Sequence, residues 1–432
     1  MHSFRMEPST PMMAQYHQVK KEFPHALVFF RLGDFYEMFF DDAVLASREL
    51  EITLTARNKE KGQSVPMCGV PYHAADGYIA KLIRKGYKVA VCDQVERPRP
   101  SQKLVRREVT RVVTPGTASG NLLEPHDNNF LTSVWIEAAG AGLASLDVST
   151  GDFRITEFAG TLANALLQTE LERLQPKEVI YPASWDSKNL PIGLINASKT
   201  PTDDWVFGFD YGQRLLTEHF GVMSLDGFGC QGHQLAVAAA GAVLHYLKDT
   251  QKSSLSHIDR LQFYEISESM ALDAITVRNL ELVQSLFDGS RQATLIACLD
   301  RTSTGMGARL LKSWLLRPEI DLPEINARLD AVAELKLRLI EREEIKAPLQ
   351  RVYDIERLLS KVSLATANAR DLVSLKSSLE QVTAIKNRLQ FFQASRLRQL
   401  DEQADPLTDV AASIGKVLRD NPPILLLSLI HI

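Results

Sequence analysis

The feature that most constrains this chain is a change in its hydrophobic pattern near residue 260. Before that point, short apolar or alternating runs are interspersed with helical periodicity, a mixture that predicts α/β structure. Beyond residue 268 apolar residues recur at spacings of three and four, as in Leu280, Val283 and Leu286 and again in Leu310 and Trp314, which predicts long helices. Since 432 residues are too many for one ordinary core, we expect a multidomain protein, α/β first and helical afterwards.

The first 115 residues are expected to form one mixed α/β domain. The pattern predicts helices over residues 11–22, 41–50 and 74–85, and strands over residues 26–31, 51–56, 88–94 and 106–113. Gly33 interrupts the first strand locally, and the run Thr114-Pro115-Gly116 marks the end of the domain.

A second α/β domain is expected over residues 116–260. Three short runs separated by glycine-containing turns predict an antiparallel meander, which helices and one further strand follow. The strands are predicted over residues 131–137, 142–148, 153–158 and 178–181, and the helices over residues 162–174 and 234–250. Residues 261–432 are expected to be the first part of a helical domain, because the chain finishes in nine apolar residues after Pro422-Pro423.

The charge of the chain is unevenly distributed. The formal net charge is −4, but residues 1–115 carry 18 Lys and Arg against 13 Asp and Glu, a net charge of +5 that leaves −9 for the rest. Only the first domain therefore has the positive excess that favours contacts with nucleic-acid phosphates.

The lack of targeting signals and the spacing of the cysteines argue against a membrane protein, a metal-binding protein and a disulfide-linked protein. The N-terminus has no apolar signal region, and the longest apolar run, residues 424–432, is far shorter than the roughly 20 residues of a membrane span, so we expect a cytosolic protein without membrane contact. The cysteines lack CxxC or His/Cys ligand spacing, so we expect no metal site and no disulfides, only buried thiols: Cys68, Cys92, Cys230 and Cys298.

The run Gly33-Asp34-Phe35-Tyr36-Glu37 has two interpretations. Aromatic residues beside a strand usually pack in a core, with the carboxylate solvated. Alternatively, side chains alternate along an extended chain, so Phe35 and Glu37 share one face while Tyr36 points inward. An apolar wedge can kink DNA from the minor groove, and a carboxylate is tolerated there only where a base offers it a hydrogen-bond donor. This second interpretation favours recognition of weakly stacked, mispaired bases.

Basic residues lie on both sides of this run in the sequence. Arg57, Lys59 and Lys61 form one group, and Arg106 and Arg107 belong to a second, basic stretch over residues 97–111 that contains a single acid. Such runs are often only solvated loops, but phosphate contacts require a local excess of this kind, and we favour that interpretation.

Two other features could suggest catalysis or ligand binding. Asp147 on a predicted strand could hold a catalytic magnesium, but the nearby acids Asp152 and Glu157 are too few for a two-metal nuclease. His245 lies in a small-residue helix and is interpreted as a hydrogen-bonded core or rim histidine, in a helix that packs closely against its neighbours. No GxxxxGK[ST] run is present, and Gly305-Met306-Gly307 is interpreted as a turn.

Several longer runs resemble one protein family in order and spacing. GDFYEMF at residues 33–39, PMCGVPYH at 66–73 and VTPGT at 113–117 resemble the mismatch-binding domain of MutS proteins. LDVSTG at 146–151 is similar to their connector domain, and DRTSTGMG at 300–307, RLL at 309–311, WL at 314–315 and DIERL at 354–358 are similar to their core helices. The resemblance extends over roughly residues 10–423.

The resemblance implies a fold and a set of site residues. It implies a mixed α/β mismatch-binding domain (1–115), an RNase H-like connector (116–260) and the first part of a helical lever or core domain (261–432), whose apolar faces we expect to be exposed. Phe35 would stack on the mismatched base and Glu37 would hydrogen-bond to it. Further DNA contacts are expected, with less specific support, from Arg57, Lys59, Met67, Tyr72, His73, Arg106 and Arg107.

The resemblance also implies a function and partners. We expect recognition of mismatches and small insertion or deletion loops in double-stranded DNA, in a homodimer that works with a MutL-type protein in the nucleoid-containing cytoplasm. ATP and Mg²⁺ are implied for the complete protein only, because clamp and ATPase sequences are expected beyond this chain, which by itself would be no enzyme. Two alternatives stay open: a relative that binds branched DNA, which typically lacks the Phe35 and Glu37 pair, and the connector nuclease considered above.

Overall fold

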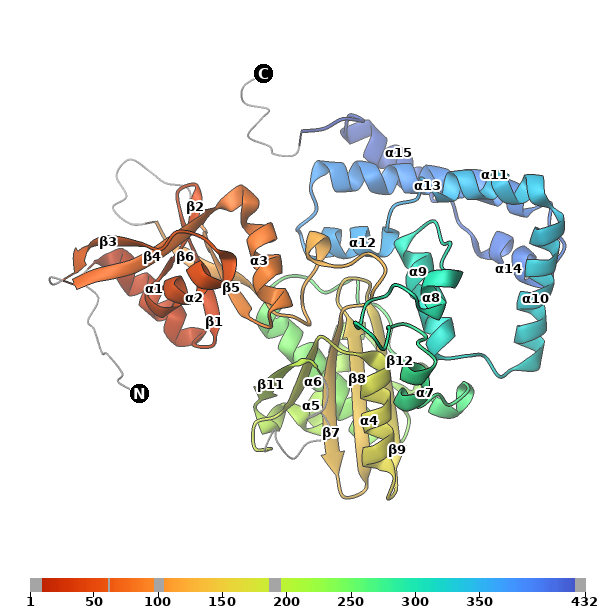
Figure 1. The fold of residues 1–432 in the computed structure, drawn as a ribbon, viewed down its shortest axis with the longest axis horizontal. Coiled ribbons are helices and arrows are strands. Elements are labelled where there is room, and N and C mark those ends of the chain that lie inside the picture. Colours follow the sequence, from red (N-terminus) through yellow and green to blue (C-terminus); the bar gives the residue numbers. More distant parts are fainter. Residues whose placement is uncertain (1–9, 61–62, 97–104, 186–195, 424–432) are drawn as a thin grey trace.

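The computed structural model describes residues 10–60, 63–96, 105–185 and 196–423. Figure 1 shows three parts in chain order: an α/β part on the left, a second α/β part at the bottom and a helical part on the right. The multidomain α/β and α composition expected from the sequence is therefore present.

The first part is a six-stranded sheet with helices on both faces. Its strand order is β3-β4-β2-β1-β5-β6, and all neighbours are antiparallel except β1 and β5. The strands are β1 (Ala26–Leu32), β2 (Phe35–Phe39), β3 (Thr55–Glu60), β4 (Gln63–Pro71), β5 (Lys88–Gln94) and β6 (Arg107–Val113). Helix α1 (Pro11–Glu22) packs on one face, and α2 (Phe40–Leu50) and α3 (Ala75–Arg84) pack on the other.

The sequence prediction for this part is partly wrong. The helix over residues 11–22 and the strand over 88–94 are confirmed with the same bounds, but β2 and most of β4 were not predicted as strands. The predicted strand over 51–56 is wrong, because Glu51 has a left-handed backbone (φ 57°, ψ 42°) that ends α2, and pairing begins only at Thr55.

The second part contains the predicted antiparallel meander. Strands β7 (Phe130–Glu137), β8 (Gly140–Asp147) and β9 (Asp152–Ala159) pair antiparallel, while β10 (Glu178–Pro182) joins β7 and β11 (Ser198–Thr202) joins β10 in parallel. With β12 (Gln262–Phe263) the order is β11-β10-β7-β8-β9-β12. Helix α4 (Ala163–Leu174) covers one face, and α5 (Phe209–Phe220), which was not predicted, and α6 (Gln234–Gln251) cover the other.

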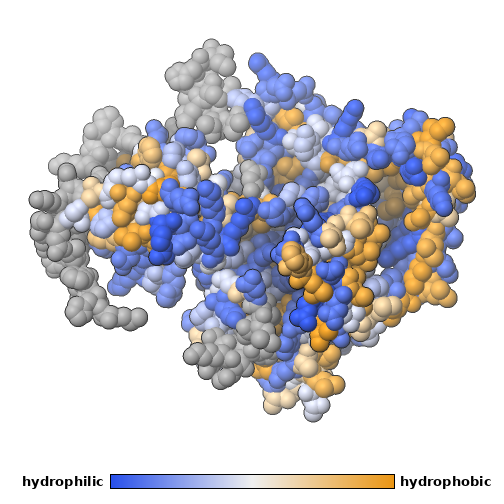
Figure 2. Space-filling model, viewed as in Figure 1, coloured by the Kyte–Doolittle hydropathy of each residue, from blue (hydrophilic) through white to orange (hydrophobic). Residues whose placement is uncertain are grey.

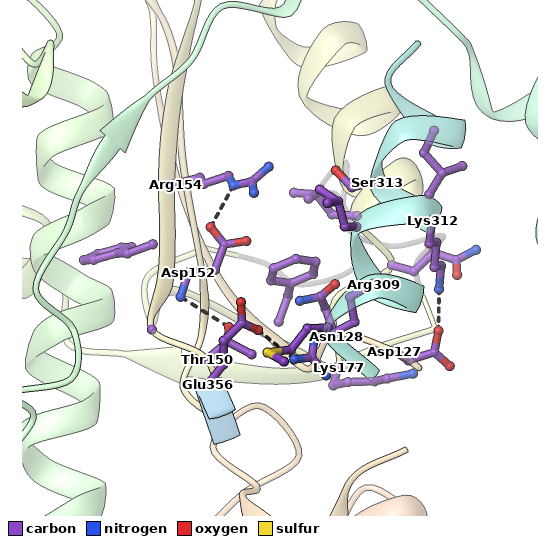
Figure 3. A pocket seen from close by; sticks show the side chains of 18 of the residues that line it. Asp127, Asn128, Thr150, Asp152, Arg154, Lys177, Arg309, Lys312, Ser313 and Glu356 are labelled. Carbon is purple, nitrogen blue, oxygen red and sulfur yellow. Dashed lines mark hydrogen bonds and ion pairs between the residues drawn. The ribbon is translucent and has the colours of Figure 1, made fainter. Parts of the chain in front are cut away.

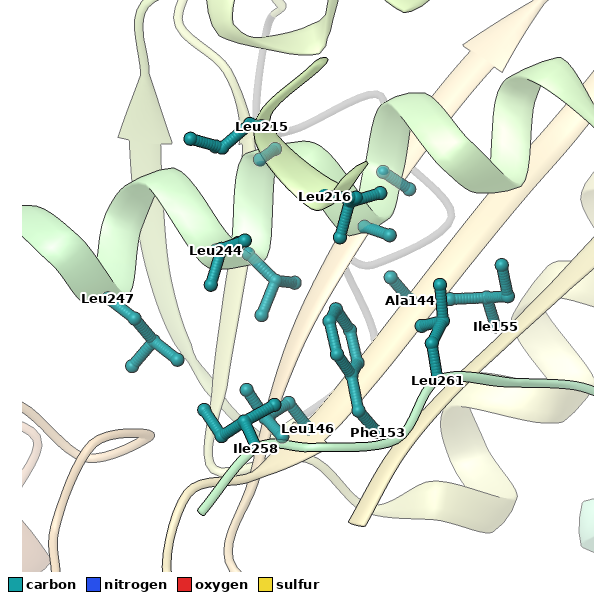
Figure 4. Close-up of a cluster of buried hydrophobic side chains, with 14 of the residues drawn as sticks. Ala144, Leu146, Phe153, Ile155, Leu215, Leu216, Leu244, Leu247, Ile258 and Leu261 are labelled. Atoms are coloured by element: carbon teal, nitrogen blue, oxygen red, sulfur yellow. The ribbon is translucent and has the colours of Figure 1, made fainter. Parts of the chain in front are cut away.

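Small residues bring α6 close to its neighbours, as the sequence predicted. A Cβ atom added to Gly241 would lie 2.3 Å from the Cα atom of Gly212 on α5, and one added to Gly142 on β8 would lie 2.1 Å from the carbonyl oxygen of Leu235. Figure 4 shows the apolar core that this approach closes, between α5 and α6 and the sheet. His245 is hydrogen-bonded to the Tyr211 hydroxyl at 2.7 Å, which confirms its structural interpretation.

The third part is helical. Its helices are α7 (Ala274–Asn279), α8 (Leu295–Leu299), α9 (Gly305–Leu316), α10 (Leu322–Leu337), α11 (Leu339–Leu349), α12 (Ile355–Ser363), α13 (Ala369–Leu389), α14 (Ser395–Gln403) and α15 (Thr408–Val417). The helix expected from Leu280, Val283 and Leu286 is wrong: α7 ends at Asn279, only Val283 is buried, and the other two side chains are exposed.

Apolar side chains on the helical part are exposed, as expected. Figure 2 shows them along the right-hand edge of the molecule, over α10, where Leu329, Val332 and Leu337 are at least 59% exposed. None of the helices described is long and apolar enough to span a membrane.

The prediction of four buried thiols is wrong for Cys298, which is exposed, and right for the other three.

Candidate nucleic-acid interface

The Gly33-Asp34 turn between β1 and β2 presents the candidate site. Gly33 has a φ of 56°, a left-handed conformation in which a glycine is unstrained. The amide of Tyr72, the residue after β4, donates to the Asp34 carbonyl at 2.9 Å and so holds the turn to the end of that strand. Phe35 is the first residue after the turn, and its side chain is 46% exposed.

Phe35 and Glu37 lie on the same face of the sheet, over one glycine. In the antiparallel pairing with β4, Phe35 is opposite Pro71 and Glu37 is opposite Gly69. A Cβ atom on Gly69 would lie 3.8 Å from Cδ1 of Phe35 and 3.5 Å from Cγ of Glu37. The missing side chain therefore leaves the aromatic ring and the half-buried acidic side chain next to each other, as the alternation of the sequence predicted.

Tyr36 points to the opposite face and is part of the core. It is 7% exposed, and its hydroxyl donates a hydrogen bond of 2.6 Å to Asp93 on β5. Burial and the neighbouring Asp93 carboxylate raise the pKa of Tyr36 well above its usual value. The core-packing interpretation of this run therefore holds for Tyr36 and is wrong for Phe35.

Helix α1 covers the other end of β2. Phe39 is fully buried there, with its ring 5.1 Å from that of Tyr16 in an edge-on arrangement. The Tyr16 hydroxyl donates to Asp42 at 3.0 Å and lies 3.1 Å from the Phe39 carbonyl oxygen, and Asp42 also accepts from Lys20 at 2.7 Å. This end of β2 is therefore anchored, while Phe35 at the other end of the strand is exposed and lies outside the cluster that packs against α1.

Tyr72 and His73 lie beside the turn, but Met67 does not. Tyr72 is half-buried, and the guanidinium carbon of Arg31 lies 3.7 Å from the centre of its ring. His73 is exposed. Met67 pairs with Phe39 and packs in the core cluster under α1, so the structure places it at the anchored end of the sheet, away from Phe35.

The predicted arginines Arg107, the first residue of β6, and Arg106, the residue before it, differ in their surroundings. Arg107 donates to the Arg31 carbonyl at 2.7 Å and to Gln15 at 3.3 Å, and burial lowers its pKa. Arg106 is exposed and paired with Glu108. Arg107 therefore braces the β1 end next to the turn, whereas the side chain of Arg106 faces solvent.

Other predicted basic residues lie wholly or partly outside the described residues. The backbone of Arg57 pairs with Val65 across β3 and β4, and Lys59 belongs to β3, but their side chains lie outside the described residues. Lys61 and most of the basic stretch, residues 97–104, also lie outside them, as does the apolar run 424–432.

The carboxylates considered for a nuclease serve the fold. Asp147 is fully buried and accepts hydrogen bonds from the Asn129 amide at 3.0 Å and the Ser149 hydroxyl at 2.6 Å. Glu157 accepts from the first amides of α6, at Leu235 and Ala236. Among the residues described, no group of three or more His, Cys, Asp or Glu could hold a metal ion.

Sequence reasoning missed three residues of this region. Gly69 separates Phe35 from Glu37, Arg31 stacks on Tyr72, and Asp93 fixes Tyr36. A glycine inside a strand often marks a close approach, so Gly69 carried a usable signal. Arg31 and Asp93 carried none, because their roles depend on the pairing of β1 with β2 and β5.

A large cleft lies elsewhere, between the second sheet and the helical part. Its volume is roughly 950 Å³, and its walls include Lys177, Arg154, Arg309 and Lys312 (Figure 3). Arg154 is paired with Asp152, Lys312 with Asp127, and Arg309 with Asp354 and Glu356, so most of these cations are already neutralised.

Comparisons with known proteins cover nearly the whole chain. Residues 10–121 match the family model of MutS domain I, residues 129–259 that of MutS domain II and residues 275–431 that of MutS domain III.

Curated relatives named DNA mismatch repair protein MutS match over the same length. The protein of Solibacter usitatus (strain Ellin6076) is 49% identical over 431 residues, 97% of this chain and 48% of the relative. That of Symbiobacterium thermophilum is 48% identical over 428 residues, 98% of this chain and 49% of the relative. The chain thus spans about half the length of the curated relatives it matches. With all three of its matched domains in the order that the sequence motifs predicted, this chain belongs to the MutS family.

Proposed function

We propose that this chain recognises mismatched bases and small insertion or deletion loops in double-stranded DNA, with Phe35 as an aromatic wedge and Glu37 as a carboxylate probe. The observation that carries the proposal is the exposed ring of Phe35 beside Glu37, over Gly69, outside the apolar cluster that packs against α1. A large aromatic side chain is normally buried, so one held outward on a rigid strand is suited to contact a partner.

The chemistry of the pair explains discrimination. Inserting a ring between base pairs costs stacking energy, and the cost is lowest where pairing is already defective. A carboxylate close to phosphates is repelled unless a base donates a hydrogen bond to it, so well-paired DNA has no compensation to offer. Phe35 would therefore select deformable sites, and Glu37 would select a base with a free donor.

The remaining predicted contacts are proposed with roles that fit their positions. Exposed His73 and Arg106 would contact the backbone of the same duplex, and Tyr72 with Arg31 would support the wedge. Arg107 would act by bracing the turn, and Met67 by packing under the sheet. Arg57 and Lys59 are proposed as phosphate contacts from the sequence alone.

The wider assignment is also a proposal. We divide the chain at residues 115 and 260 into a mismatch-binding domain, an RNase H-like connector and the first part of a lever domain. The strand order β11-β10-β7-β8-β9, with an antiparallel meander followed by parallel strands, supports the RNase H-like assignment. In the complete protein we propose a homodimer that couples recognition to ATP and Mg²⁺, works with a MutL-type partner and is found with the nucleoid in the cytoplasm.

The proposal is tested by binding of this chain to labelled duplexes at one fixed salt concentration. The duplexes are fully matched, carry a G·T mismatch, carry one unpaired T, or form a four-way junction. The variants are Phe35→Ala, Glu37→Gln and, as a control, Val44→Ala, which removes a similarly exposed apolar side chain from α2 on the opposite face. Aromatic stacking on a base contributes about 1–3 kcal/mol, so Phe35→Ala should reduce the preference for mismatched duplexes about fivefold or more.

Each result is decisive for one interpretation. A preference that Phe35→Ala removes and Val44→Ala preserves supports the wedge. Equal binding of the unmodified chain to matched and mismatched duplexes would contradict the proposal. Tighter binding to the junction than to any mismatch would instead favour the branched-DNA alternative.

A further inference from the structure

The segment of residues 118–127, here called the linker segment, belongs to two parts of the molecule at once. Ala118 and Leu122 are buried in the apolar cluster of the first sheet, together with Val113 and Leu82. Arg84 on α3 also pairs with Glu124 at 2.8 Å. One side of the linker segment, which follows the mismatch-binding domain proposed above, is therefore packed into the core of that domain.

Its other side is held by the helical part. The guanidinium of Arg357 on α12 donates to the carbonyl of Glu124 at 2.9 Å and to that of Asp127 at 2.7 Å. Arg309 on α9 donates to the carbonyl of Pro125 at 3.0 Å. The acceptors are backbone carbonyls, which any residue at those positions would offer.

Both arginines are buried and fixed. Arg309 is 5% exposed and donates to both carboxylate oxygens of Asp354, at 2.7 and 3.0 Å, and to Glu356 at 2.6 Å. Arg357 is 8% exposed. Bidentate guanidinium contacts are directional, and a buried guanidinium that loses its acceptors is costly, so this arrangement resists displacement.

Lys312 adds a charged contact to the same segment. Its ammonium lies 2.7 Å from the carboxylate of Asp127 (Figure 3). Burial alone would raise the pKa of Asp127, but the ammonium outweighs it and the pKa is lowered. The packing is also tight, since a Cβ atom on Gly305 would lie 2.8 Å from the Pro125 carbonyl oxygen.

We infer that the linker segment couples the mismatch-binding domain directly to the lever helices α9 and α12, with Arg309 and Arg357 as the positioning residues. Any rotation of the first sheet on DNA must move Ala118 and Leu122, which are part of its core. The same segment cannot move without displacing the carbonyl oxygens that these two arginines hold. The inference rests on the proposed function, because it concerns the structural response to DNA binding.

A second connection makes the inference specific. The first sheet also contacts the connector, where Lys88 on β5 reaches Glu178 on β10. A signal that travelled through the connector would depend on this pair and on the second sheet. The linker segment bypasses both, so the two routes are separable by single substitutions.

The experiment is amide hydrogen exchange on the whole chain, free and saturated with a matched or a G·T duplex, with DNA binding measured on the same samples. The variants are Arg357→Lys, which keeps the charge but replaces the planar, branched guanidinium with a single nitrogen, Arg357→Met, Lys88→Met for the connector route, and Arg351→Met as a control for an exposed arginine of the same part. Each variant used must have unaltered helical content and be fully folded at the temperature of the exchange experiment.

We expect the amide exchange rates in α12 (Ile355–Ser363) to differ about fivefold or more between the mismatched and the matched complex. Fivefold is the lower end of ordinary allosteric coupling between two sites. This difference should persist in Lys88→Met and Arg351→Met and be lost in both Arg357 variants. A merely structural role of Arg357 would alter exchange equally with either duplex.

The failures are distinguishable. If the chain does not prefer mismatched DNA, the proposed function is wrong. If it prefers mismatched DNA but exchange in α12 is unaffected, or the effect is lost in Lys88→Met and kept in Arg357→Lys, the linker route is wrong and the proposed function stands.

Discussion

The ammonium of Lys88 lies 3.1 Å from the carboxylate of Glu178, and this ion pair joins the first sheet to the second. Glu178 is completely buried and also accepts hydrogen bonds from the Gly116 amide at 3.0 Å, the Tyr246 hydroxyl at 2.8 Å, and the hydroxyls of Thr114 and Thr200. A buried carboxylate is stable only when its oxygens are fully paired, and here donors from both sheets and the segment between them are required.

Lys88→Met should therefore destabilise the junction of the two α/β parts. The substitution keeps an apolar stem of similar length but removes the cation, leaving a buried carboxylate with neutral donors only. Because those four donors remain, we expect a loss of about 2 kcal/mol in the free energy of unfolding, below the 3–5 kcal/mol for a fully unpaired charge. Urea denaturation measures it, and an unchanged midpoint would contradict the importance of the pair.

The same variant should shift the pH dependence of stability. Burial alone would raise the pKa of Glu178, but the Lys88 ammonium and the hydroxyl donors outweigh it, and the pKa is lower than that of an ordinary glutamate. A lowered pKa in the folded state means that the contribution is complete above about pH 4.5 and is lost as the pH falls further. Lys88→Met should move acid unfolding to a higher pH, measured by circular dichroism.

Local periodicity predicted the directions of side chains along β2 better than it predicted the contacts between the three parts of the chain. The alternation along residues 35–37 requires only an extended backbone, so the shared face of Phe35 and Glu37 and the inward direction of Tyr36 could be predicted. Met67 was expected to contact DNA because it lies in the PMCGVPYH run. Its position opposite Phe39 depends on the register of β2 and β4, which no local pattern fixes.

The charged residues between domains could not be predicted for a related reason. Arg309, Arg357 and Lys88 look like ordinary surface residues in the sequence, and only docking of separate parts buries or pairs them. Glu178 carried a weak signal, since it opens an otherwise apolar strand. The residues near 280–286 show the opposite failure: helical spacing is present, but packing of Val283 and Leu282 against Ile296 fixes an irregular segment instead.

The thiols should differ in reactivity. Burial raises the pKa of Cys68 to about 11, of Cys92 to about 12 and of Cys230 to about 11, whereas Cys298 is exposed. Since the thiolate is the nucleophile, the native chain at pH 8 should react rapidly with an aromatic disulfide reagent at Cys298, and Cys298→Ser should abolish the rapid phase. Peptide mapping of the modified chain identifies the site, and rapid labelling of Cys68 or Cys92 would contradict the buried positions.

Gly241→Ala should destabilise the second α/β part, although alanine is the better helix former. The added Cβ atom would lie 2.3 Å from the Cα atom of Gly212, a backbone atom that cannot rotate away, so α5 and α6 must separate. Overpacking of this kind costs about 1–3 kcal/mol, enough to exceed the gain of about 1 kcal/mol in helix propensity. Gly227→Ala, where no atom lies within 4 Å of the new Cβ, is the matched control in thermal unfolding.

Gly69→Ala should separate stability from discrimination at the proposed wedge. The new methyl group would lie 3.4 Å from the Tyr36 carbonyl oxygen, 3.5 Å from Glu37 Cγ and 3.8 Å from Phe35 Cδ1, all at or beyond the lower limit of ordinary contact. Alanine also loses less backbone entropy in a strand than glycine, so the melting temperature should be unchanged or higher. The methyl group nevertheless fills the space between the ring and the carboxylate, where the edge of a stacked base would enter. We expect the mismatch preference to fall several-fold, and further in Gly69→Val, while binding to matched DNA is retained.

Gly77→Ala provides the comparison, because it makes the same chemical change on α3 with no atom within 4 Å of the new Cβ. It should leave both the melting temperature and the mismatch preference close to those of the unmodified chain. If Gly69→Ala retains the full preference while Phe35→Ala removes it, then the base does not approach over Gly69, and the ring must act after turning away from the sheet. If both glycine variants lose preference equally, the effect is not local to the Phe35 and Glu37 pair, because Gly77 contacts neither side chain.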